Sequence, residues 1–158
     1  MSPADARMLV LAAEIERDLA QVERHAERSQ RVSPEAGDPE AAYVALALDH
    51  AYQAFESLLV RVERSLGLPR REGAEWHREI LREAALPISG LRPAIIPEGA
   101  EQAWGELLGF RHFLRHAYSY DLDAQRLIVL RQHLQDAVAA TVPRVTQFVA
   151  GLRRATTN

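Results

Sequence analysis

Residues 44–67 read VALALDHAYQAFESLLVRVERSLG, and their apolar side chains recur at a helical period. The apolar residues of one face are Val44, Leu48, Ala51, Phe55, Leu58, Val62 and Leu66. Steps of three and four residues place side chains on one side of an α-helix. A turn cluster over 32–39 precedes this helix, so we predict Asp38 as its N-cap and Pro39 in its first turn. Gly67 is predicted to end it.

The same period runs through the rest of the chain. Met8, Ala12, Ile15, Leu19, Val22 and Ala26 form the stripe of a first helix over about residues 4–30. Later helices are predicted over about 74–85, from Gly99 through Leu114, and from the Asp121/Asp123 cap through Leu152, the last kinked at Pro143. No segment alternates with a period of two. We therefore predict an all-α fold, an up-and-down bundle of four long helices plus one short helix, with residues 1–158 as a single domain.

We expect a loop and a group of large side chains to position these helices. Residues 87–97 (PISGLRPAIIP) hold three Pro and one Gly, which predicts an extended loop against the core. The large side chains of Tyr52, Phe55, Trp104 and Phe110 are interpreted as core residues.

Composition excludes several classes of protein. The chain has 158 residues, 47% of them apolar, and contains no Cys, so disulfides, thiolate metal sites and a Cys nucleophile are excluded. The net charge of −3 argues against coating of nucleic acid by bulk electrostatics. No apolar run approaches the length of a membrane span, and we expect a cytoplasmic protein without membrane contact. All 19 basic residues are Arg, which fits coding bias as well as a need for guanidinium groups.

The densest group of reactive side chains is FRHFLRHAYSYD at 110–121, at the predicted end of the fourth helix. Arg111, Arg115 and Tyr118 lie within about 60° of one another around a helix, and His112 and His116 form a neighbouring row. Arg111 and His116 are about 140° apart on a straight helix, so they share a site only if the helix end unwinds or if the site lies in a groove that wraps the helix, as a two-fold partner helix would provide. We expect both to lie at an exposed helix end, where truncation costs little stability. Complementing the helix dipole is an alternative use for part of this charge.

The two histidines also have the spacing of metal ligands, His112-x3-His116. No third ligand is near in the sequence, and no Glu-x-x-His pair of the di-iron bundles occurs. We therefore predict no metal and no cofactor. His50 and His77 are interpreted as surface or hydrogen-bonded structural histidines.

Arg111-x4-His116-x-Tyr118 resembles the Arg-x4–6-His-x-Tyr signature of the HEPN superfamily, and most of all its HepT-like toxins. The stretch LDHAYQAFE at 48–56, Trp76-His77, the Arg92-Pro93 loop and Phe110-Arg111-His112 are similar to the HepT-like pattern at similar spacings. The resemblance covers roughly residues 40–150.

The resemblance implies a metal-independent endoribonuclease, the toxin of a toxin–antitoxin pair, that acts as a homodimer with a composite site. It implies that Arg111 and His116 are catalytic, that cleavage leaves a 2′,3′-cyclic phosphate, and that His112, Arg115 and Tyr118 support catalysis or bind RNA. The implied partner is a minimal nucleotidyltransferase antitoxin that places AMP on the motif Tyr118, with Tyr120 as the rival acceptor.

Two other classes of function stay open. One is a catalytically silent HEPN helical module that binds a nucleotidyltransferase or another partner. The other is a four-helix carrier of a metal or ligand. RNA cleavage in excess EDTA separates the ribonuclease from both.

Overall fold

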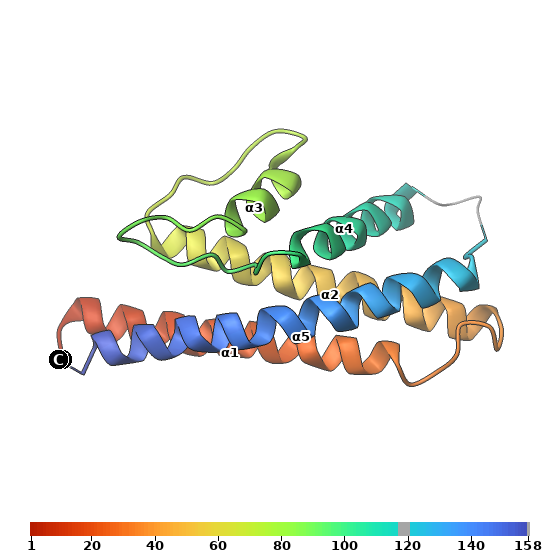
Figure 1. The fold of residues 1–158 in the computed structure, drawn as a ribbon, viewed down its shortest axis with the longest axis horizontal. Coiled ribbons are helices and arrows are strands. Elements are labelled where there is room, and N and C mark those ends of the chain that lie inside the picture. Colours follow the sequence, from red (N-terminus) through yellow and green to blue (C-terminus); the bar gives the residue numbers. More distant parts are fainter. Residues whose placement is uncertain (117–120, 158) are drawn as a thin grey trace.

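The computed structural model describes residues 1–116 and 121–157, which contain five α-helices. They are α1 (Pro3–Ser29), α2 (Asp38–Ser65), α3 (Trp76–Ala84), α4 (Ala100–His116) and α5 (Ala124–Ala155). No β-strand occurs among these described residues, so the predicted all-α class is confirmed. The long helices α1, α2 and α5 form the body of the bundle, and α3 and α4 lie along one side of it (Figure 1).

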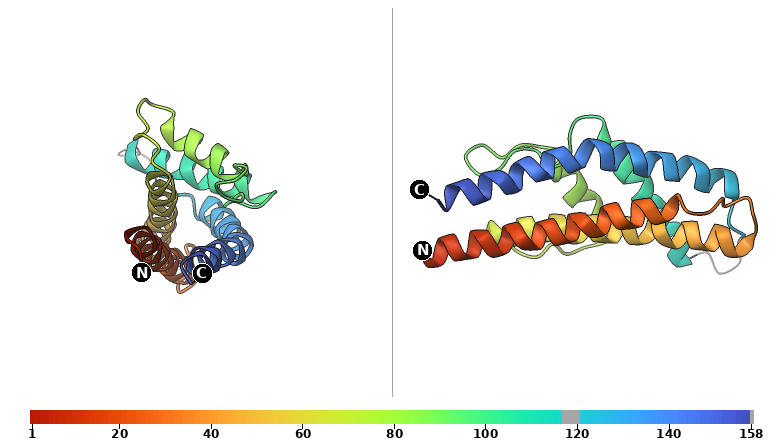
Figure 2. Two further views of the ribbon diagram at one scale, coloured as in Figure 1. Left: turned by 90° about the vertical axis from the view of Figure 1, so that its left-hand side faces the viewer. Right: turned by 90° about the horizontal axis from the view of Figure 1, so that it is seen from below.

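The helix contacts follow this arrangement. α1 packs against α2 and α5, α4 packs against α2 and α5, and α3 packs against α4 and α2. With 17 residues, α4 is shorter than α1 (27), α2 (28) and α5 (32), so the fourth helix of the bundle spans only part of its length. The start of α1 and the end of α5 lie at the same end of the molecule (Figure 2). None of the helices in the described residues has an apolar stretch long enough to cross a bilayer.

The ends of α2 show how local sequence sets its limits. The predicted N-cap is wrong by one residue, because Gly37 occupies the cap position without a side-chain hydrogen bond and Asp38 is already helical. At the other end α2 stops at Ser65, and Gly67 adopts the left-handed φ of 73°. The Gly67 N–H donates to the carbonyl of Arg64 at 3.0 Å, which satisfies one of the free carbonyls of the last turn. Gly67 thus ends α2 as predicted.

The start of α5 also agrees with its sequence. The Asp123 side chain accepts a hydrogen bond from the Gln125 N–H at 2.9 Å, as an N-cap does. The helix then continues through Pro143 as one element to Ala155.

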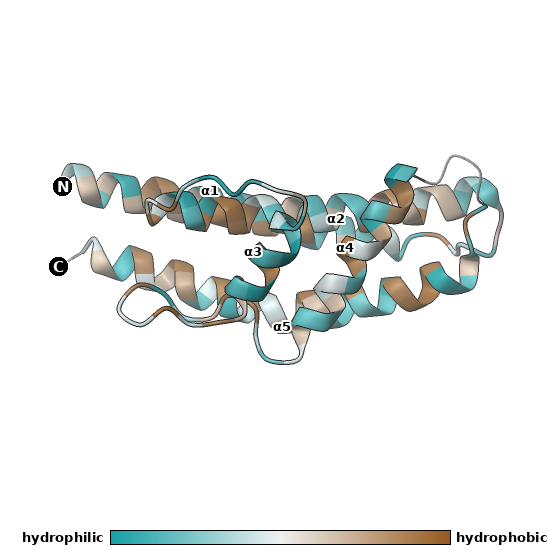
Figure 3. Ribbon diagram, turned by 90° about the horizontal axis from the view of Figure 1, so that it is seen from above, coloured by the Kyte–Doolittle hydropathy of each residue, from teal (hydrophilic) through white to brown (hydrophobic). Residues whose placement is uncertain are grey.

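The core is centred on aromatic side chains of α2 and α4. Tyr52, Phe55, Trp104 and Phe110 are each no more than 2% exposed, which confirms them as core residues. The rings of Phe55 and Trp104 stack with their centroids 3.9 Å apart, and the indole Nε1–H donates to the hydroxyl of Thr141 at 3.1 Å. Apolar and polar residues recur in turn along every helix at a helical period, so each helix has one side for the core and one for water (Figure 3).

The predicted loop over 87–97 lies within the connection from α3 to α4, the longest non-helical segment among the described residues. Its end is packed into the core, because Ile95 and Ile96 are buried and both backbone N–H groups donate to the carbonyl of Ala84. Arg92 is also buried within this segment. The loop therefore fixes where α4 begins.

Candidate functional site

Arg111 lies on the core-facing side of α4. Trp104, Leu107 and Leu108 are buried on this helix, and Arg111 follows them at helical spacing. Its side chain is only 16% exposed, and its Nη1–H donates to Oδ1 of Asp49 on α2 at 3.1 Å. The expectation of an exposed helix end is therefore wrong for Arg111, because the buried stripe of α4 continues to this residue.

Asp49 is held from two directions. Its Oδ2 accepts a hydrogen bond from Nε2 of Gln53 at 2.7 Å, while Oδ1 accepts from Arg111. On the arginine side, Nε is buried and has no hydrogen-bond partner among residues 1–116 and 121–157. The carboxylate thus orients the guanidinium through Nη1 and leaves Nε without a hydrogen bond.

His112 faces α3 instead. Its ring centroid is 5.6 Å from that of His77, with the two rings nearly perpendicular. Burial lowers the pKa of His112 from its ordinary value, and the positive charges of His77, Arg78, Arg111 and Arg115 lower this pKa further. The site therefore favours the neutral imidazole of His112, the form that can accept a proton.

His77, which contacts His112, belongs to a chain of hydrogen-bonded side chains. Oε2 of Glu56 on α2 accepts from the hydroxyl of Tyr52 at 2.9 Å and lies 2.7 Å from Nδ1 of His77. Burial and the neighbouring Glu56 raise the pKa of Tyr52, so the phenol stays a donor. The ring of Trp76 stacks on the imidazole of His77, with the two ring centroids 3.7 Å apart. This chain ties α3 to α2 and fixes the imidazole that meets His112.

The rest of the predicted site lies at the tip of α4. Arg115 and His116 are both exposed in the last turn of the helix. No hydrogen bond or ion pair within the described part of the chain joins His116 to Arg111. Tyr118 and its rival Tyr120 lie outside the described residues.

The histidine pair of α4 does not form part of a metal cluster in the described ranges. Across residues 1–116 and 121–157, no group of three or more His, Asp or Glu side chains is placed to hold a metal ion. His77 is the hydrogen-bonded structural histidine that the sequence suggested, and His50 makes an edge contact with His25 at 5.2 Å.

A family model described as HepT-like protein matches residues 43–152. This range is more than half of the chain, and it includes Asp49, Glu56, α3 and the whole Arg-x4-His-x-Tyr motif. The chain belongs to the HepT-like family. HepT-like and other HEPN proteins are generally nuclease-related and usually dimerise. Searches of curated proteins and of solved structures each found no match.

Within this HepT-like chain, two site residues were not predicted from the sequence. Asp49 and Glu56 belong to the stretch that carries the resemblance, but nothing in a single sequence pairs them with Arg111 and His77. The burial of Arg111 was predictable, since residue 111 continues the stripe of Trp104 that indicates the core.

The ion pair gives a stability prediction. Replacing Arg111 by Ala leaves the half-buried carboxylate of Asp49 with one donor fewer, and we expect a loss of about 1–2 kcal/mol in the free energy of unfolding. This corresponds to a Tm lower by about 2–8 °C in a chain of this size. The matched control is Arg115→Ala, one turn further and exposed, which should change stability by no more than about 0.5 kcal/mol. Adding Asp49→Ala to Arg111→Ala should cost less than the two single changes together, and full additivity would contradict the ion pair.

The environment of His112 gives a titration prediction. Because its pKa is lowered, His112 takes up its proton at a lower pH than an ordinary histidine as the pH falls. NMR titration of the imidazole Cε1–H signals, with His112→Gln for assignment, measures this pKa. His77→Gln removes the facing histidine and should raise the pKa of His112 part of the way, since the burial remains. A His112 pKa at or above the ordinary value in the unsubstituted protein would contradict the geometry.

Proposed function

We propose that this HepT-like protein is a metal-independent endoribonuclease, the toxin of a toxin–antitoxin pair, that acts in the cytoplasm. The observation that carries the proposal is Arg111, held by Asp49 at the start of the Arg-x4-His-x-Tyr motif, with Nε of its guanidinium unpaired. Exposed His116 lies in the last turn of the same helix.

The chemistry needs a proton carrier and a fixed cation. The 2′-hydroxyl of RNA attacks the adjacent phosphorus, the new 2′-O–P bond closes a 2′,3′-cyclic phosphate, and the P–O5′ bond breaks. His116 takes the proton of the 2′-hydroxyl, or returns one to the leaving 5′-oxygen, because an imidazole exchanges protons near neutral pH. Arg111 stabilises the negative charge of the phosphorane. Neutral His112 is a second proton acceptor, Arg115 binds a flanking phosphate, and Tyr118 positions the RNA.

A homodimer is part of this proposal. Arg111 turns toward α2 while His116 is exposed, which supports a site whose arginine and histidine come from different chains. A two-fold dimer with α4 near its axis supplies such a groove. Two copies of the cluster also give an acidic protein a locally positive cleft, and local charge governs the binding of phosphate.

The proposed partner is a minimal nucleotidyltransferase antitoxin. It transfers AMP from ATP to the Tyr118 hydroxyl: the phenol oxygen bonds to the α-phosphorus, pyrophosphate leaves, and the phenol proton is released. The added phosphodiester would pair with Arg111 or Arg115 and occupy the place of the RNA. The second candidate function is a silent helical module that binds this partner, which the low exposure of Arg111 favours.

The ribonuclease proposal predicts RNA cleavage in excess EDTA, with 2′,3′-cyclic phosphate ends on the products. Arg111→Ala and His116→Ala should each lower the rate by at least about 100-fold, as expected for loss of charge stabilisation or of proton transfer. His112→Ala should have the smaller effect. Gel analysis of labelled RNA at a temperature well below the Tm of each variant separates catalysis from unfolding. Cleavage by Arg111→Ala at the wild-type rate would contradict the mechanism, and cleavage by no form of the protein would favour the silent module.

A mixed dimer of two inactive variants tests whether the active site is shared between two chains. Co-expression with two different affinity tags isolates the mixed dimer of one Arg111→Ala chain and one His116→Ala chain. In a shared site, this dimer keeps one intact arginine–histidine pair and recovers part of the activity that both parents lack. If each chain holds a complete site, the mixed dimer stays inactive.

The proposed silencing of the toxin by AMP transfer predicts that one residue is modified. After incubation with the proposed nucleotidyltransferase partner and ATP, mass spectrometry should locate AMP on Tyr118, and Tyr118→Phe should remain unmodified. Tyr120→Phe is the matched control and should accept AMP normally. A silenced protein with unmodified Tyr118 would mean that the partner inhibits by binding alone.

A further inference from the structure

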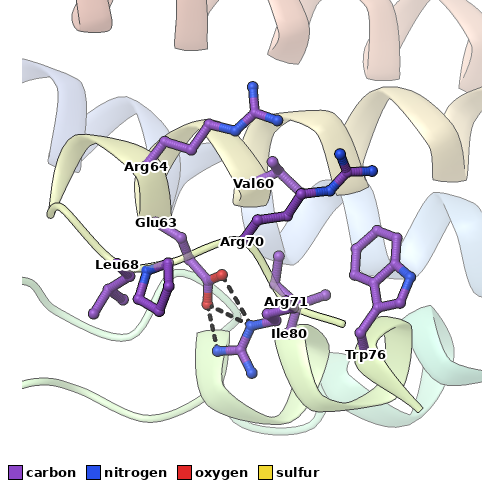
Figure 4. Close-up of a pocket in the computed structure, with 9 residues that line it drawn as sticks. Val60, Glu63, Arg64, Leu68, Arg70, Arg71, Trp76 and Ile80 are labelled. Carbon is purple, nitrogen blue, oxygen red and sulfur yellow. Dashed lines mark hydrogen bonds and ion pairs between the residues drawn. The ribbon is translucent and has the colours of Figure 1, made fainter. Parts of the chain in front are cut away.

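A hollow runs between α2 and the segment 66–75 that joins α2 to α3. Two adjoining cavities of about 130 and 320 Å³ share Val60, Arg64 and Trp76 as lining residues. Together they reach the size range of small-molecule pockets, on the order of 300–1,000 Å³. Figure 4 shows that Arg64 and Arg70 both extend toward the side on which the indole of Trp76 lies.

The two acidic residues that line this groove are already paired. Glu63 receives two N–H groups of Arg71, at 2.6 and 2.9 Å (Figure 4), and Arg71 also pairs with Glu83. Glu56 is buried and bonded to Tyr52 and His77 in the chain described above. Carboxylates held by internal donors repel an incoming phosphate less than free ones do.

Two arginines of the groove are free. Arg64 and Arg70 are exposed, and neither has an ion-pair partner within residues 1–116 and 121–157. Arg61, which also lines the larger cavity, is bound to Glu14 and Asp18 across the helix interface. The groove therefore offers two unpaired guanidinium groups beside one aromatic ring, a combination that binds a base together with a phosphate.

Ring contacts link the groove to the candidate active site. Trp76 lines both cavities and stacks on His77 with the two centroids 3.7 Å apart. His77 in turn meets His112 at 5.6 Å, and His112 is adjacent to Arg111 in the chain. The groove and the motif on α4 are therefore joined through Trp76, His77 and His112.

We propose that this groove binds a nucleotide of the RNA substrate several nucleotides away from the scissile phosphate, with its base on Trp76 and its phosphate on Arg64 and Arg70. The assignment of RNA as the ligand rests on the proposed ribonuclease function. A free nucleotide presents the same base and phosphate, so the experiment must separate the two sources.

The test measures equilibrium binding, without cleavage. A fluorescein-labelled RNA 12-mer in which every 2′-hydroxyl is methylated has no nucleophile, so the wild-type protein cannot cleave it. Fluorescence anisotropy then gives the Kd of the intact RNA. Trp76→Leu should weaken binding by about 5- to 150-fold, the range for loss of one base–aromatic stack. Trp76→Phe keeps an aromatic face and should restore most of the affinity. Binding should also quench the tryptophan fluorescence of the wild-type protein, and Trp76→Phe should abolish this quenching because Trp104 is buried.

The salt dependence of RNA binding distinguishes the contribution of base stacking from that of the charged groups. The Arg64→Gln/Arg70→Gln variant should lower the slope of log K against log salt by about 0.7 for each phosphate that the protein no longer binds, whereas Trp76→Leu should leave the slope unchanged. The charge-matched control is Arg24→Gln/Arg154→Gln, which removes two exposed guanidinium groups from α1 and α5 and should bind as wild type. The melting curve of each variant checks that it is folded.

The outcomes are distinct. Wild-type affinity in both groove variants would overturn the subsite, whatever the cleavage assay shows. Saturable binding of AMP alone, with no binding of the 12-mer, would overturn the assignment to RNA. Variant-sensitive binding of the 12-mer by a protein that cleaves no RNA would uphold the subsite and reject only the ribonuclease.

Discussion

The stack of Phe55 on Trp104 sets the register between α2 and α4, and the candidate site depends on that register. From this contact the two helices run in opposite directions: six residues back along α2 lies Asp49, and seven residues on along α4 lies Arg111. At 1.5 Å per residue both steps cover about 10 Å, so the carboxylate and the guanidinium arrive at the same level. A close-packed aromatic pair tolerates little sliding, so it holds the polar pair in place.

The helices could be predicted from the sequence because burial imposes a period that each segment shows on its own. Val44 to Leu66 needed no knowledge of what covers them, and Gly67 ends α2 for a reason local to its backbone. The site depends on contacts between distant residues instead. The partner of Arg111 lies 62 residues away, and the partner of His77 lies 21 residues away. Because any of the 22 acidic residues satisfies the chemistry equally well, only the packing of α2, α3 and α4 selects Asp49 and Glu56.

The arginines of this chain differ in their structural roles. Several are turned inward, where one guanidinium bonds more than one carbonyl: Arg131 reaches those of Ser29 and Val32 around the end of α1, and Arg92 reaches those of Glu83, Leu86 and Pro93 around the end of α3. Among these carbonyls, those of Ser29 and Glu83 belong to the last turns of α1 and α3, where the helical N–H donor four residues on is missing. The compact ammonium group of a lysine lacks this forked geometry. Arginine without lysine therefore has a structural use in this chain, apart from any contact with RNA.

The two ends of the chain lie side by side, and the end of α4 lies at the far end of the bundle (Figure 1, Figure 2). A tether attached at residue 3 or residue 155 therefore leads away from Arg111 and His116. The protein can be fixed to a bead, a surface or a second folded module through either end while the tip of α4 stays accessible. A peptide linker that joins the two ends would close the polypeptide into a ring without crossing the tip of α4.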